Sequence, residues 1–114
     1  MAKQKTVPRP LRRNEYLIVF HTTQAEKGWQ DLAATTRNAL ATAWEELTAN
    51  PIRNDKTCHP LKGPLAEIMR AGQTYTQRQY ELPGGARLWY YVTEGPPKTV
   101  NLVNVHTHHP NATK

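Results

Sequence analysis

The chain has 114 residues and a mass of 13.0 kDa, which leaves room for one domain. Fifteen Lys and Arg against nine Asp and Glu give a formal net charge of +6 and a pI near 9.7, a balance that favours a polyanionic partner. A single cysteine, Cys58, excludes an intramolecular disulfide, and no apolar run approaches the ~18 residues of a membrane span. The basic N-terminus precedes only five clearly apolar residues, too few for a secretory signal, so we expect a cytoplasmic protein.

Residues 1–14 contain two prolines, five Lys or Arg and almost no apolar side chain. Such a composition is typical of a flexible, basic arm, and part of the positive charge of the chain lies in it. We therefore divide the chain into an arm, residues 1–14, and a single domain, residues 15–114.

The first half of the domain predicts one strand and two helices. YLIVFH, residues 16–21, has the length and the β-branched content of a strand. Thr23 and Glu26 form a capping box, and Asn50 with Pro51 marks the end of the second helix. Apolar residues at helical spacing make one stripe on each helix: Ala25, Trp29, Leu32 and Ala33, then Ala39, Leu40, Ala43, Trp44 and Leu47. We expect a helical hairpin with a tryptophan on the buried side of each helix.

The second half predicts strands. Residues 51–64 hold three prolines and read as a long loop, and residues 65–71 fit either a short helix or a strand. YTQRQYEL, ARLWYYVT and TVNLVNVHT are strand-like runs joined by PGG and EGPPK turns, which predicts a β-meander. The predicted class is α+β: an N-terminal helical hairpin packed on one face of a twisted, mostly antiparallel sheet of four to five strands.

Alternation in ARLWYYV separates its side chains into two sets. Leu88, Tyr90 and Val92 fit the core, which sends Arg87, Trp89 and Tyr91 to the face that the helices leave uncovered. An aromatic ring beside an arginine can stack a base while the cation holds a phosphate. A surface arginine packed across a tryptophan explains the same pattern without RNA, and both interpretations stay open.

The turn before this run decides which side chains accompany Arg87. If the PGG loop leaves an odd number of residues unpaired, Gln77, Gln79 and Glu81 lie on the face of Arg87; if the number is even, Arg78 and Tyr80 do. The apolar pattern favours the odd number. In the last run, Val100 and Leu102 alternate with Val103 and Val105, so hydrophobicity does not say which way His106, His108 and His109 point.

The sequence offers no sign of a metal or a nucleotide cofactor. The three C-terminal histidines and the distant Cys58 do not have the spacing of a zinc site. Neither GxGxxG nor GxxxxGK[ST] occurs in the chain. We therefore expect no metal and no cofactor.

Together these segments resemble the RelE/ParE superfamily of toxins from bacterial type II toxin-antitoxin systems, from about Tyr16 to Thr113. The resemblance rests on the order and spacing of five pieces: Trp-x-x-Leu in the first helix (Trp29, Leu32), the end of the second helix (Leu47, Asn50, Pro51), HPLKGPL, GARLWYYV and THHPNAT. It implies a RelE-like fold, similar to microbial ribonucleases, and a cognate antitoxin as partner. RelE-like members cut messenger RNA on the ribosome without a metal, whereas ParE-like members inhibit DNA gyrase and are not nucleases.

The nuclease function needs a base, an acid and cations for the phosphate. Arg87 matches the arginine of the RelE stretch G-x-R-L-x-Y, so the resemblance makes it the phosphate clamp, with Arg78 as a second cation. Glu81 or Glu67 is the candidate base, and His106, His109 or their neighbour the acid, because histidine titrates near neutral pH. The expected RNA-binding residues are Lys62, His59, Trp89 and His108.

Two features depart from the RelE pattern. No tyrosine follows Tyr91, although several RelE-like nucleases carry one near the C-terminal end, and glutamines flank Arg78 where cations are expected. The predicted function is a ribosome-dependent mRNA endoribonuclease that inhibits translation. A ParE-like gyrase inhibitor and a basic RNA-binding module without toxicity are the alternatives.

Overall fold

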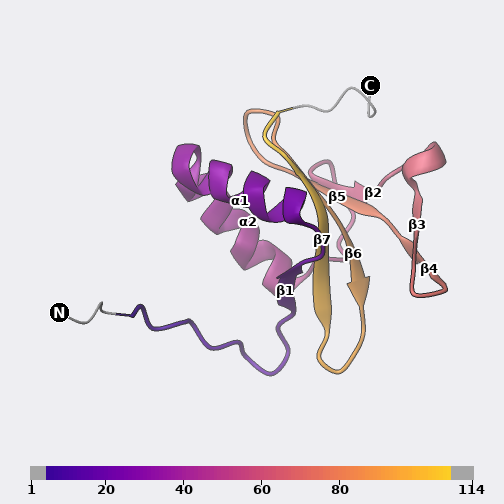
Figure 1. Ribbon diagram of the computed structural model, residues 1–114, viewed down its shortest axis with the longest axis horizontal. Coiled ribbons are helices and arrows are strands. Elements are labelled where there is room, and N and C mark those ends of the chain that lie inside the picture. Colours follow the sequence, from indigo (N-terminus) through magenta and orange to yellow (C-terminus); the bar gives the residue numbers. More distant parts are fainter. Residues whose placement is uncertain (1–4, 109–114) are drawn as a thin grey trace.

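The computed structural model describes residues 5–108 of the chain (Figure 1). Its elements, in chain order, are β1 (Leu17–Phe20), α1 (Thr23–Thr35), α2 (Arg37–Ala49), β2 (Cys58–Pro60), a 3-10 turn (Gly63–Leu65), β3 (Glu67–Arg70), β4 (Gln73–Thr76), β5 (Arg78–Glu81), β6 (Arg87–Thr93) and β7 (Thr99–His106). Two N-terminal helices pack on a mixed five-stranded sheet, and β3 and β4 form a separate small hairpin. The predicted α+β class is confirmed.

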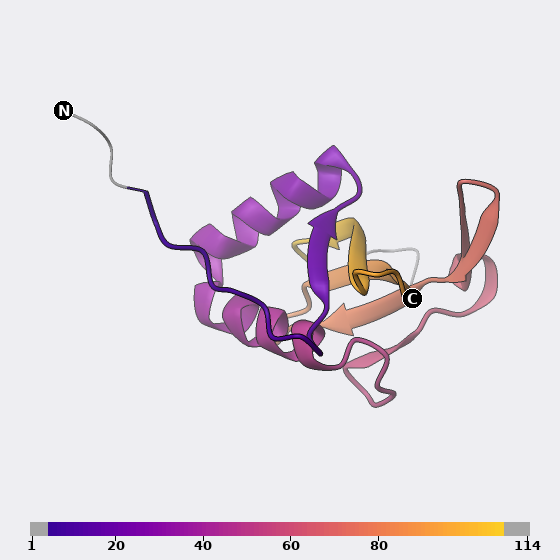
Figure 2. The ribbon, with the colours of Figure 1, turned by 90° about the horizontal axis from the view of Figure 1, so that it is seen from below.

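The sheet has the strand order β1-β7-β6-β5-β2. The predicted meander of β5, β6 and β7 is antiparallel throughout, and only β1 runs parallel to its neighbour, β7. Figure 2 shows α1 and α2 on one side of this sheet and the β3–β4 hairpin on the other. We call the side away from the helices the second face.

The core lies between the helices and the sheet. It includes Leu32 and Leu47 from the helices and Leu88, Tyr90 and Leu102 from the strands, each almost fully buried. The two helix tryptophans, Trp29 and Trp44, are only half-buried. Trp29 packs against the core, as expected for the buried side of its helix, whereas Trp44 is not among the residues that pack against it. Neither helix in residues 5–108 is long and apolar enough to cross a bilayer.

The helix ends differ slightly from the predicted ones. Thr22, not Thr23, is the N-cap of α1: its Oγ1 accepts the amide hydrogen of Ala25 at 3.0 Å and donates to the carbonyl of Val103 at 2.6 Å. The second contact is with β7, which is distant in the sequence, so a local motif could not predict it. α2 ends at Ala49 with Asn50 as its C-cap, as predicted.

Two predictions between residues 51 and 82 are wrong in detail. The expected loop of residues 51–64 contains the short strand β2, which pairs with β5 at the edge of the sheet. YTQRQYEL is not one strand, because the chain passes from the hairpin to the main sheet at Gln77, whose side-chain amide donates to the carbonyl of Leu65 at 2.9 Å. Residues 65–71, left open by the sequence, form the end of a 3-10 turn and then β3.

A β-bulge in β7 resolves the conflicting alternation in TVNLVNVH. Trp89 pairs with Asn104 but Tyr90 pairs with Leu102, so Val103 has no partner in β6. One extra residue shifts the alternation by one position. As a result both Leu102 and Val105 reach the core, and His106 turns to the second face.

α1 holds the bulged part of β7 closely. The side-chain amide of Gln24 continues the ladder beyond β1, since Nε2 donates to the carbonyl of Val105 at 2.8 Å and Oε1 accepts its amide hydrogen at 2.9 Å. A Cβ atom on Gly28 would lie 2.4 Å from the Val105 carbonyl oxygen. Glycine at this position therefore permits the close approach of helix and strand.

Candidate functional site

Cross-strand register collects the candidate residues in rows on the second face. Glu81, Arg87 and His106 are direct partners across β5, β6 and β7. The next row is formed by His59, Gln79, Trp89 and Asn104. Five residues separate Glu81 from Arg87, which confirms the odd loop, and the side chains of directly paired residues lie on the same face.

Arg87, Trp89 and Tyr91 lie on the second face, as the alternation in their strand predicts, but they are not exposed. Arg87 is 8% exposed, Trp89 5% and Tyr91 4%. The expectation of an open surface for base stacking on Trp89 is therefore wrong. Its indole Nε1 instead donates to Gln79 Oε1 at 3.0 Å, and its ring meets that of His106 edge-on, with 4.4 Å between centroids.

Arg87 forms an ion pair with Glu81, with 2.5 Å between Nη1 and Oε1. The side chain of the arginine is almost buried, whereas that of the glutamate is about one-third exposed. Nε of Arg87 is buried and has no hydrogen-bond partner within residues 5–108. A buried donor without a partner costs about 1–3 kcal/mol, so a ligand that accepts a hydrogen bond from this nitrogen would stabilise the site.

His106 completes the row beside Arg87. Its Nε2 is the second buried polar atom without a hydrogen-bond partner in the described part of the chain. Burial, followed by the nearby charge of His108, lowers the pKa of His106 below its usual value of 6.5. The ring is therefore mostly neutral at pH 7 and can accept a proton.

Arg78 does not join this row. It pairs with Tyr90 on the helix side, where Nε donates to the Pro51 carbonyl and Nη2 to Asn54 Oδ1, both at 3.0 Å, and Nη2 also donates to the carbonyl of Arg53. The prediction that Arg78 is a second catalytic cation is therefore wrong, because its guanidinium binds the loop after α2.

The other predicted residues lie apart. Lys62 and His108 are exposed, and Glu67 belongs to the separate β3–β4 hairpin, where it pairs with Thr76. Of the two candidate bases, only Glu81 contacts Arg87. His59 shares the row of Trp89, as described above. His109 lies outside the described residues.

A second polar cluster on this face was not predicted. Tyr91 stacks on Tyr75 of β4 with 4.8 Å between ring centroids, and the ring of His21 meets Tyr91 edge-on at 5.6 Å. Arg70 of β3 donates from Nε to His21 Nε2 at 2.8 Å. These four residues come from separate segments, so no spacing in the sequence could have revealed them.

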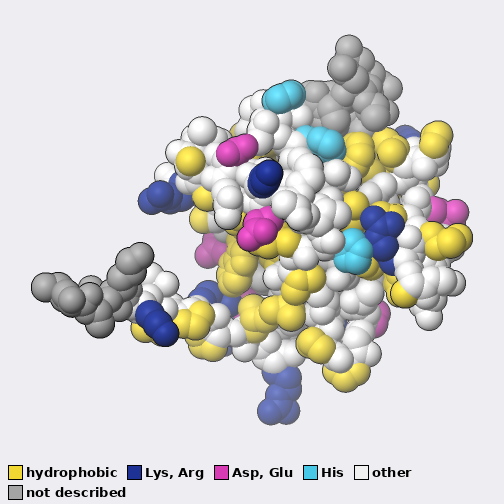
Figure 3. All heavy atoms as spheres, viewed as in Figure 1, with side chains coloured by type: hydrophobic (Ala, Val, Ile, Leu, Met, Phe, Trp, Pro, Cys, Tyr) yellow, Lys and Arg dark blue, Asp and Glu magenta, His cyan; other side chains and the backbone are white. Residues whose placement is uncertain are grey.

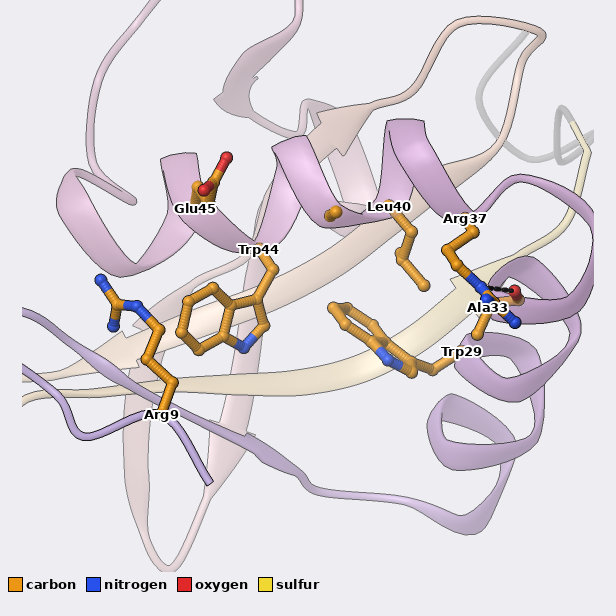
Figure 4. A pocket seen from close by; sticks show the side chains of 8 residues that line it. Arg9, Trp29, Ala33, Arg37, Leu40, Trp44 and Glu45 are labelled. Carbon is orange, nitrogen blue, oxygen red and sulfur yellow. Dashed lines mark hydrogen bonds between the residues drawn. The ribbon is translucent and has the colours of Figure 1, made fainter. Parts of the chain in front are cut away.

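The helices carry a groove on their outer side (Figure 4). Its hollow measures about 350 Å³ and is lined by Arg9, Trp29, Ala33, Arg37, Leu40, Ala41, Trp44 and Glu45. Arg9 of the N-terminal arm lies over the Trp44 ring, with 5.0 Å from Cζ to the centroid, and forms an ion pair with Glu15 at 3.0 Å. The arm is thus attached to the domain at this point.

In comparison with known proteins, no family model, no curated protein and no solved structure matches the chain. Within residues 5–108, no group of three or more His, Cys, Asp or Glu side chains gathers in the way a metal ion requires.

Proposed function

We propose that the protein is a RelE-like toxin, a metal-independent endoribonuclease that cuts messenger RNA on the ribosome and is neutralised by a cognate antitoxin. One observation carries this proposal: Arg87 and His106 are direct partners across β6 and β7, and each has a buried nitrogen without a partner among the described residues. The net charge of +6 supports a polyanionic substrate.

The two side chains supply complementary parts of one reaction. Neutral His106 removes the proton of a ribose 2′-hydroxyl, and the oxygen attacks the adjacent phosphorus. The phosphorus–5′-oxygen bond breaks, which leaves a 2′,3′-cyclic phosphate and, after protonation of the leaving oxygen, a 5′-hydroxyl. Arg87 stabilises the charge on the phosphate with its planar set of donors. The lowered pKa of His106 favours the base over the acid role expected from the sequence.

Glu81 holds Arg87 in place before RNA binds. Its carboxylate neutralises an almost buried guanidinium, which would otherwise be destabilising. A phosphate must compete with this carboxylate for the arginine donors, and the buried nitrogens must become accessible. Substrate binding therefore requires a local rearrangement around the β5–β6 turn.

The groove between α1 and α2 is the proposed docking surface for an acidic antitoxin segment. The half-buried Trp29 and Trp44 provide apolar area, and Arg37 lies at one end of the groove as an exposed cation (Figure 4). This chemistry fits an amphipathic peptide that carries Leu-type anchors and a carboxylate. The substitution Trp44→Ala would then weaken antitoxin binding and leave RNA cleavage unchanged.

The decisive experiment adds the purified protein to translating ribosomes with a defined messenger RNA and maps the cut ends. We expect cuts with 2′,3′-cyclic phosphate ends in the presence of EDTA, and no cuts with Arg87→Gln or His106→Ala. Intact messenger RNA together with loss of gyrase supercoiling activity would refute the nuclease and favour a ParE-like toxin. RNA binding without either effect would favour a binding module.

A further inference from the structure

We infer that Arg70, His21, Tyr75 and Tyr91 form a second RNA subsite, which binds a phosphate and a base a few nucleotides away from the bond that is cut. This inference rests on the proposed nuclease function and extends it to a part of the second face for which that function has no use. The cluster brings together the residue after β1, the end of β3, and residues of β4 and β6.

The arginine of this cluster is held by neutral groups. Nε donates to His21 Nε2 at 2.8 Å and Nη1 donates to the Met69 carbonyl at 2.8 Å. Because His21 Nε2 accepts from an arginine, the proton of the neutral ring lies on Nδ1, which faces the Tyr91 hydroxyl at 3.4 Å. Within residues 5–108 no carboxylate forms an ion pair with Arg70.

This makes Arg70 different from Arg87. Arg87 is neutralised by Glu81, whereas Arg70 is half-buried, oriented by two hydrogen bonds and uncompensated in charge. Its Nη2 makes no hydrogen bond to the described residues. A guanidinium with a fixed plane and free donors is suited to a phosphate. Figure 3 shows a histidine and a basic side chain together on the visible face beside the hairpin.

Aromatic rings stand beside this cation. Tyr75 is half-buried and stacks on the buried Tyr91, with an angle of 31° between the rings, so Tyr91 supports Tyr75 from below. A supported, partly exposed ring next to a phosphate ligand is typical of single-stranded RNA recognition. The chemical class of the ligand is therefore a nucleotide within a single strand.

The distance to the cutting site fits one continuous strand of RNA. Tyr91 follows Arg87 by four residues in β6 and lies on the same face, which corresponds to about 13 Å at ~3.3 Å per residue. This is the span of a few nucleotides. RNA that passes across the second face in this direction meets the Arg87 site and then the Arg70 cluster.

The test uses single-stranded RNA with 2′-O-methyl groups, which cannot be cut, and measures its dissociation constant at fixed salt by fluorescence anisotropy. We expect Arg70→Gln to weaken binding about tenfold and to reduce the slope of log Kd against log salt by about one. Gln can still donate to His21, which preserves the hairpin. Lys27→Gln on the exposed surface of α1 also removes one positive charge outside this face and should change Kd less than twofold.

Length dependence separates the subsite from general electrostatics. The penalty of Arg70→Gln should disappear with an oligonucleotide too short to reach from Arg87 to Arg70. Equal binding by Arg70→Gln and the unsubstituted protein, or no binding by the latter, would overturn the subsite even if RNA is cut on ribosomes. Binding that depends on Arg70 without any cleavage would instead uphold the subsite and refute the nuclease.

Discussion

Arg87 and His106 face each other across the β6–β7 ladder, and the bulge at Val103 is the reason. Without the extra residue, Val105 would turn to the second face and His106 to the core side of the sheet, because side chains alternate along a strand. The bulge therefore places His106 in the only row of the described strands that contains a glutamate, an arginine and a histidine.

The charge of Arg87 is not sufficient for the proposed reaction. Arg87→Lys keeps the charge but loses the planar donors, so we expect cleavage on the ribosome to fall about 100-fold. Arg37→Lys, on the surface of α2, is the matched control and should cleave like the unsubstituted protein. Equal rates for both variants would show that the guanidinium does not contact the reacting phosphate.

The cleavage rate should depend on pH through His106. Since burial lowers the pKa of this histidine below 6.5, its neutral form increases as the pH rises and already predominates at pH 6.5. We expect the rate to rise with pH, with a midpoint below 6.5, and then to reach a plateau. Measuring initial rates from pH 4.5 to 8 tests this, and a rate that falls over that range would assign His106 the acid role.

Loss of Glu81 should lower the stability of the fold but raise its affinity for RNA. Glu81→Gln leaves the guanidinium of Arg87 without its counter-charge, which we expect to cost about 1–3 kcal/mol, because the pair is partly exposed. The same change removes the competitor of the phosphate, so RNA should bind more tightly. Urea unfolding and anisotropy measure the two effects, and a loss of cleavage at unchanged affinity would instead indicate that Glu81 is the base.

The loop after α2 should respond to acid through Asp55. Hydrogen bonds from the Thr57 backbone and side chain, from the Cys58 backbone and from Arg53 lower the pKa of Asp55 to about 2, from an ordinary value of 3.8. The folded state therefore binds this proton less readily than the unfolded chain, so the stabilisation is complete above pH 3.8 and is lost as the pH falls towards 2. Asp55→Asn should make Tm less dependent on pH below 4, whereas Asp31→Asn, at an exposed position of α1, should not.

Gly28 should tolerate no side chain. Its α-carbon is so close to β7 that a Cβ atom would overlap the Val105 carbonyl, and we expect Gly28→Ala to destabilise the fold by about 1–3 kcal/mol. Gln30→Ala on the exposed side of α1 is the control. Thermal unfolding would contradict the close approach if both variants melted at the same temperature.

The sequence predicts the parts of this fold that depend on alternation within one strand. Leu88, Tyr90 and Val92 reach the core, and the apolar pattern also favours the odd loop that puts Glu81 beside Arg87. It could not locate the bulge, because Leu102 and Val103 are both apolar and either can lie in the core. The choice among the histidines depends on that one position.

The sequence could not predict contacts between distant segments of the chain. Arg78 looks like a second catalytic cation in its strand, but the carbonyl groups that bind it belong to Pro51 and Arg53 in a loop some 25 residues earlier. The cluster around Tyr91 likewise joins His21 and Arg70, which are 49 residues apart. Such pairs become neighbours only through tertiary structure, which local propensity does not encode.

The position of β7 also has a kinetic consequence. This strand comes last among the described elements, yet it lies between β1 and β6 and under α1, with Val105 against Gly28. Until it docks, β1 has no partner in the sheet and α1 lacks the strand that forms most of its packing surface. Pairing of such distant segments is slow, so the growing chain keeps apolar surface exposed until β7 has been synthesised and has docked, and aggregation competes with folding during that interval.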